Sequence, residues 1–139
     1  MRHVLALLLL TTPAYAWEFT PTPICTLSHT EASAAVAVTY DHATRLYAIA
    51  VTNPDGWPAS PVFSIRFDGA AANTISTQRH QTDGATLTVT DSGFGNVLDG
   101  LEFNTVATAF TATGAATVSL DGAAGPVQQF RACTTAPLT

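Results

Sequence analysis

The chain of 139 residues carries a formal net charge of −5, only 11% of its residues are charged, and it contains no lysine. This length permits one domain with a targeting segment and excludes a multidomain assembly. The hydrophobic fraction of 47% is ordinary for a folded domain and excludes a disordered chain. Because acidic residues outnumber basic ones and no basic run occurs, we expect neither nucleic acid nor an anionic membrane surface as a partner.

Residues 1–16 have the pattern of a secretory signal peptide. A basic start precedes the apolar run 4–10, which is far shorter than the roughly 20 residues needed to span a bilayer. A small-x-small cleavage site then ends at Ala16. We expect cleavage after Ala16, which leaves residues 17–139 as a single periplasmic or secreted domain without a membrane span.

The chain has two cysteines, Cys25 and Cys133. In an oxidising compartment such a pair, with no third cysteine to compete, is expected to form a disulfide. Closing so long a loop stabilises a fold by roughly 4–5 kcal/mol in the chain-entropy model. The alternative is two separate buried thiols. Two distant cysteines form neither a CxxC redox motif nor a structural zinc site.

Alternation of apolar and polar residues with period two predicts strands through much of the chain. Segments 36–40 and 47–51 form a predicted hairpin around the turn 41–44, and segment 63–67 forms a further strand. Segments 74–79 and 85–90 are predicted to pair through a loop that holds Gly84. Segments 106–111 and 117–120, on either side of Gly114, are two further predicted strands.

Helical signals are few. Asn96 is a suitable cap for a short helix whose apolar side is formed by Val97, Leu98 and Leu101. Pro126 suits the first position of a second helix, near residues 126–133. We expect both helices to have two turns at most. The pattern therefore predicts a mainly β fold, a single antiparallel β-sandwich or half-open barrel with one or two short helices.

Five segments spread over residues 17–139 carry a family resemblance. They are 17–19, 24–27, 74–80, 93–103 and 130–133. Together they resemble a family of small exported proteins from alphaproteobacteria, whose members often bear the label of an excinuclease ABC component. In layout the chain is also similar, more remotely, to periplasmic proteins of the invasion-associated locus B type. The resemblance implies an exported β-rich domain and supplies no catalytic residues.

The excinuclease label conflicts with the residues. A nucleotide-driven repair helicase needs a GxxxxGK[ST] loop to hold phosphate, and this chain contains no lysine. The export signal and the acidic balance also conflict with that activity. We therefore expect that the protein is not a DNA-repair helicase.

No set of residues predicts catalysis, a metal or a cofactor. Asp91, Ser92 and Gly93 resemble the surroundings of a protease nucleophile, but that chemistry requires a converging histidine, a carboxylate and an oxyanion hole. More simply, these residues end a strand. The spacing of His29, His42 and His80 selects no metal ion, and we expect solvent-facing histidines in turns.

A candidate contact surface is predicted from two aromatic residues and a glycine-containing loop. Trp57 lies in a loop, where it either anchors a partner or caps the end of the core. Phe94 lies between Gly93 and Gly95, just before Asn96, and is either an exposed contact or a plug in the core. The glycines themselves form either an anion-binding nest or a tight turn.

These observations predict a non-catalytic binding or structural domain whose partner is another envelope protein. The alternative is a carrier of a small ligand, with an apolar pocket between the sheets lined by residues such as Phe63, Phe67 and Phe110. A third hypothesis is a small hydrolase that uses His80 with nearby acids.

Overall fold

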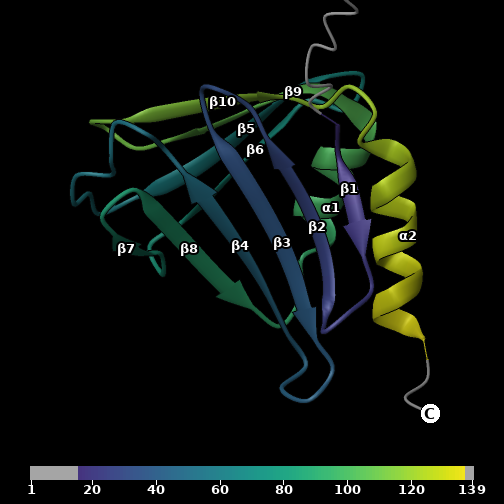
Figure 1. Ribbon diagram of the computed structural model, residues 1–139. Helices are drawn as coiled ribbons and strands as arrows, with labels where there is room; N and C mark the ends of the chain where they lie inside the picture. Colours follow the sequence, from purple (N-terminus) through teal and green to yellow (C-terminus); the bar gives the residue numbers. More distant parts are fainter. Residues whose placement is uncertain (1–15, 137–139) are drawn as a thin grey trace, which may run out of the picture.

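The computed structural model describes residues 16–136, so the predicted signal peptide 1–16 lies outside the described residues except for its last one. The chain forms two packed antiparallel sheets and two helices (Figure 1). This architecture confirms the mainly β, sandwich-like fold predicted from the alternation. Within residues 16–136, no helix combines the length and the apolar character needed to cross a membrane.

The larger sheet has six strands in the order β1-β2-β3-β4-β8-β7. They are β1 (Glu18–Thr20), β2 (Cys25–Thr30), β3 (Ala35–Asp41), β4 (Leu46–Thr52), β7 (Gln81–Asp83) and β8 (Thr86–Asp91). The predicted hairpin of 36–40 and 47–51 is confirmed as β3 and β4, where Val38 lies opposite Ile49. Alternate side chains of these strands face the core, and the others form an outer face of threonine, serine and alanine.

The smaller sheet has four strands in the order β10-β9-β5-β6. They are β5 (Phe63–Gly69), β6 (Asn73–Thr77), β9 (Asn104–Phe110) and β10 (Ala115–Ser119). Figure 1 shows this sheet lying across one end of the larger sheet. The strands predicted at 106–111 and 117–120 are confirmed as β9 and β10, and the structure pairs them with each other.

The predicted pairing of segments 74–79 and 85–90 is wrong. β6 pairs with β5 in the smaller sheet, whereas β8 pairs with β4 in the larger one. After β6 the chain crosses between the sheets over residues 78–80, forms β7 and then turns at Gly84 into β8. Gly84 has a φ of +59°, which glycine adopts without steric cost. The turn at Gly84 therefore exists, but it joins β8 to β7 rather than to β6.

The two helices pack against each other and against both sheets. α1 (Gly95–Phe103) contacts β5, β6 and β9, and α2 (Ala124–Thr135) lies along β1 and β2 (Figure 1). Arg131 of α2 bonds two carboxylates of α1, at 2.7 Å from Asp99 and 2.9 Å from Glu102. These bonds fix the two helices relative to each other.

The helix near residues 126–133 is confirmed as α2. Both helices exceed the predicted two turns, with 9 residues in α1 and 12 in α2. The predicted cap at Asn96 is wrong, because α1 begins at Gly95, with Phe94 at the capping position and no side-chain cap bond. In place of a side-chain cap, burial of one apolar side stabilises α1. That side consists of Val97, Leu98 and Leu101.

The predicted disulfide between Cys25 and Cys133 is confirmed, with a Cα–Cα distance of 6.0 Å. It joins the start of β2 to α2, across a sequence separation of 108 residues. The bond therefore ties the last helix to an early strand of the larger sheet.

Candidate functional site

A groove of about 380 Å³ opens between β6 of the smaller sheet and β8 of the larger one. The loop that follows β8 and the first turn of α1 close one end of it. It exists because the chain crosses between the sheets after β6, so that β6 and β8 face each other without pairing. A space of this volume lies within the range of ligand sites in proteins.

The floor of the groove is an uncovered continuation of the hydrophobic core. Ile49, Phe63 and Ile65 form its deep part and are each 5% exposed or less. Ile75 of β6 and Val89 of β8 also line it, but they are only partly buried and pack at the margin of the core. Filling the groove with an apolar group would remove these two side chains from water, at roughly 25 cal/mol per Å² of apolar surface buried.

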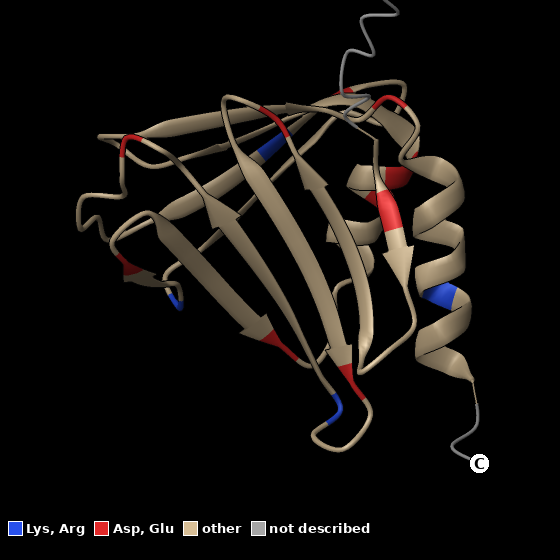
Figure 2. Cartoon of the chain, viewed as in Figure 1, with Lys and Arg blue, Asp and Glu red and all other residues tan. Residues whose placement is uncertain are grey.

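One ion pair connects the two walls of the groove. The Arg79 Nη2 atom, just beyond β6, lies 3.2 Å from the Asp91 Oδ2 atom at the end of β8. The two side chains are 76% and 39% exposed, so this pair stabilises the fold by at most about 1 kcal/mol and weakens with salt. Figure 2 shows how sparse the other charges are along the strands that form this region.

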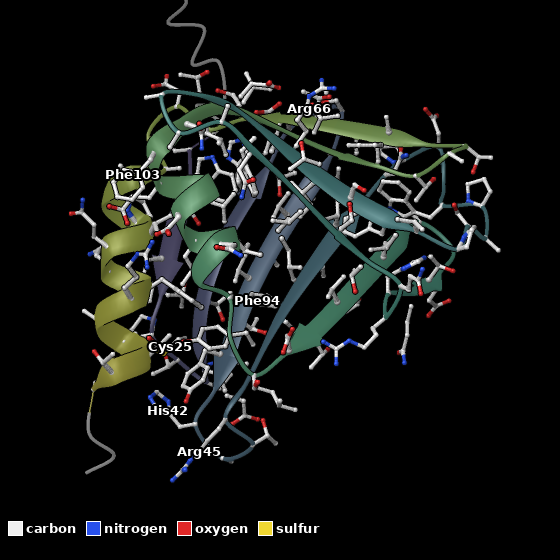
Figure 3. The ribbon with its side chains drawn as sticks, turned by 180° about the vertical axis from the view of Figure 1, so that it is seen from behind. Cys25, His42, Arg45, Arg66, Phe94 and Phe103 are labelled. Carbon is white, nitrogen blue, oxygen red and sulfur yellow. A yellow bond between two sulfur atoms is a disulfide. The ribbon has the colours of Figure 1, made fainter. Side chains whose placement is uncertain are left out.

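The loop of Gly93, Gly95 and Asn96 is exposed and reaches the groove, but the ring of Phe94 points into the protein. Phe94 is 5% exposed and stacks on Tyr47, with 5.4 Å between ring centroids. Figure 3 shows Phe94 below α1, toward the end of the molecule that carries Arg45. Of the two hypotheses for Phe94, the structure confirms the second: the ring is buried in the core and is not an exposed contact.

Trp57 does not line the groove and does not share a surface with the loop. It is 5% exposed, and its Nε1 atom donates a hydrogen bond of 3.0 Å to the carbonyl of Val51. Its ring packs edge-on against Phe63 and lies close to the backbone at Gly114. Trp57 therefore caps the core, and its side chain is not available to a partner.

The expectation of solvent-facing histidines is wrong for His29, because His29 occupies an inward-facing position of β2. His29 is 4% exposed and stacks on Trp17, with 4.7 Å between ring centroids. Its Nε2 atom lies 2.8 Å from a carboxylate oxygen of Glu31, which also accepts a bond of 2.8 Å from the Ser119 N–H. Burial raises the pKa of Glu31, but the hydrogen bonds from His29, Ser119 and Ser33, together with the charge of His29, outweigh burial and hold the pKa below its ordinary value.

The other two histidines, His42 and His80, are only partly exposed, and each has one ring nitrogen that is buried. His80 Nε2 lies 2.7 Å from the carbonyl of Ser60, and its ring packs against Phe63. His42 contacts the ring of Tyr40. Within residues 16–136, no three histidine, cysteine or acidic side chains come close enough to hold a metal ion.

A closed pocket lined by Phe63, Phe67 and Phe110 is not present among the described residues. Phe67 is fully buried, and the cavity beside it measures only about 20 Å³. Phe110 lines neither that cavity nor the groove, and only Phe63 reaches the groove. The space between the sheets is therefore filled at its centre and open at the side where β6 and β8 lie.

The sequence pointed to Gly93, Gly95 and Asn96, but the residues of β6 and β8 that complete the groove were missed. Comparison of the chain with models of known families, with curated proteins and with solved structures found no match. The groove is thus interpreted from its own geometry.

Proposed function

We propose that this protein is a non-catalytic binding domain, periplasmic or secreted, which holds its partner at the groove between β6 and β8. The observation that carries the proposal is the incomplete cover of Ile75 and Val89, which are part of the core margin yet face an open space. A free apolar floor of this kind is stabilised by an occupant that removes it from water.

The proposal that the domain works outside the cytoplasm rests on the signal-like segment 1–16 and on the disulfide between Cys25 and Cys133. Disulfides persist in oxidising compartments, with which this bond is compatible. We propose an envelope protein as the partner.

The second candidate is a carrier of a small apolar ligand in the same groove. Its volume of about 380 Å³ and its apolar floor favour this function. The two candidates differ in what occupies the groove, a polypeptide or a small molecule.

The test is native mass spectrometry of the full chain expressed with its own leader segment and recovered from the periplasm. We expect an additional bound mass in the wild-type protein and its loss in Val89→Glu, which places a charge on the groove floor. Thr90→Glu is the matched control, because Thr90 is the exposed neighbour on β8. Equal retention in both variants, or no bound mass in the wild type, would contradict binding at the groove.

A further inference from the structure

Among residues 16–136, each sheet ends in two edge strands, whose outer N–H and C=O groups have no neighbouring strand. The edges of the larger sheet are β1 and β7, and those of the smaller sheet are β10 and β6. Free edges are templates for pairing with another chain, and natural proteins protect them. The four edges of this protein differ in their protection.

The outer edge of β10 is blocked by side chains from the larger sheet and its connecting loops. Four such bonds reach the main chain of β10. They run from Asn53 Nδ2 to the Ala115 carbonyl (3.4 Å), from Ser33 Oγ to the Thr117 carbonyl (2.9 Å), from Trp17 Nε1 to the Ser119 carbonyl (2.9 Å), and from the Ser119 N–H to Glu31 (2.8 Å). An added strand could pair with β10 only by displacing them.

The two edges of the larger sheet are protected in other ways. β1 has three residues and α2 packs against it (Figure 1). β7 also has three residues and carries Asp83. Short edge strands and edge charges are both devices that prevent pairing with another chain.

Within residues 16–136, β6 is longer than β1 and β7 and lacks both edge charges and blocking side-chain bonds, although α1 contacts it. It has five residues, Asn73–Thr77, without proline or charge, and no side chain of the described residues bonds its main chain. Across the groove, β7 pairs with β8 only as far as Thr88, so that residues 89–91 also lack a strand on that side. The groove therefore has unpaired main chain on both walls and the apolar side chains of Ile75 and Val89 between them.

We propose that β6 is the docking edge for an extended segment of a partner protein, which adds a fifth strand to the smaller sheet and places alternate apolar side chains on Ile75 and Val89. This inference rests on the proposed function and specifies its partner as a strand-forming peptide. Main-chain bonds to β6 supply affinity, and the groove floor selects apolar residues at every second position.

The occupant is a partner segment rather than a second copy of this chain. Within Asn73–Thr77 the only apolar side chain is Ile75, and it already faces the groove of its own chain. The β6 strand of a second copy would thus bring only one apolar side chain to a groove floor that consists of five apolar side chains. Because Arg79 and Asp91 neutralise each other, the inward side chains of the segment are expected to be uncharged.

The probe is a synthetic peptide of alternating valine and threonine, long enough to pair with all of β6, added to the oxidised full chain after recovery from the periplasm. We expect it to bind and to slow amide hydrogen exchange at residues 73–77. Ile75→Lys is expected to raise the dissociation constant about tenfold or more, by placing a charge on the floor. Thr74→Lys is the matched control, because Thr74 is exposed and is the neighbour of Ile75 on β6.

Two versions of the peptide, each N-methylated along one of its edges, test the main-chain bonds directly. We expect one version to lose binding, because its blocked edge faces β6. If both versions bind like the parent peptide, the inference is overturned, since side chains alone then supply the affinity. The same conclusion holds if the chain dimerises without peptide and Ile75→Lys makes it monomeric, because the occupant is then a second copy.

The dye anilinonaphthalene sulfonate, whose aromatic rings bind apolar surfaces, separates this inference from the proposed function. If the dye binds in a manner sensitive to Ile75→Lys but the peptide does not bind, the groove is a ligand site and the strand inference is wrong. If neither binds, the proposed function fails as well.

Discussion

The side chain of Gly100 is a single hydrogen because the ring of Phe67 leaves no room for more. A Cβ atom at this position would lie 2.4 Å from the ring carbons of Phe67, which is fully buried and cannot swing away. We therefore expect Gly100→Ala to lower the free energy of unfolding by about 1–3 kcal/mol. Urea denaturation of the oxidised protein measures this change.

Gly125 in α2 provides the control, because a Cβ atom there meets nothing within 4 Å. Gly125→Ala is expected to raise the free energy of unfolding by about 0.4–1 kcal/mol, since alanine restricts the unfolded chain. Equal losses in both variants would show that crowding against Phe67 is not the cause.

The carboxylate of Glu31 makes stability depend on pH. Because the pKa of Glu31 is lowered in the folded protein, its contribution is complete above the unfolded value of about 4.3 and is lost as the pH falls through the native pKa. We expect Glu31→Gln to be less stable than the wild type at neutral pH, with a difference that shrinks below about pH 4.3. Urea midpoints measured across this range test the expectation.

Glu18→Gln is the matched control, because Glu18 is exposed in the neighbouring strand β1. Its difference from the wild type is expected to be small at every pH. A Glu31→Gln difference that stays constant down to pH 2 would mean that ionisation of Glu31 contributes nothing.

Single residues were the hardest part of the site to predict from the sequence. Gly93 and Asn96 could be singled out because a glycine-containing loop before a helix has a local signature. Ile75 and Val89 could not, because in sequence they look like any inward residue of a strand. Their incomplete cover results from contacts between two sheets, which no local pattern reports.

At the scale of elements, the disulfide between Cys25 and Cys133 links β2 covalently to α2. Removing the bond with the double variant Cys25→Ser, Cys133→Ser is expected to lower the free energy of unfolding by roughly 4–5 kcal/mol in the chain-entropy model, because it frees a long loop in the unfolded chain. Urea denaturation compares it with the oxidised wild type. The wild type treated with reductant should match the double variant, and a loss below about 1 kcal/mol in either would contradict the expectation.

The elements differed in how well their sequences predicted them. β3, β4, β5, β9 and β10 have clear alternation and were predicted, because one face of each is apolar. β1 and β7 have three residues each, too few for a period to be seen, and β2 places the polar His29 inward. The pairing of β6 was missed because nothing in residues 78–80 signals a crossing between sheets.

At the scale of the whole molecule, protection of the sheet edges is uneven. Side chains, a helix or shortness protect β10, β1 and β7, whereas β6 lies beside the groove and, within residues 16–136, has neither edge charges nor blocking side-chain bonds, although α1 contacts it. An open edge next to exposed apolar side chains also favours aggregation. Its position beside a preformed groove is therefore consistent with a binding role that compensates for this risk.

The disulfide also sets an order of events in the making of this protein. Cys133 follows Cys25 by 108 residues, so the bond cannot form until the chain between the two cysteines has been synthesised and both thiols meet an oxidant. In the folded protein, α2 covers β1 and β2, so the bond joins the helix to the sheet that it packs against. Oxidation of this pair therefore comes after synthesis of the chain as far as Cys133, and a chain truncated before residue 133 would keep Cys25 as a free thiol that could pair with another molecule.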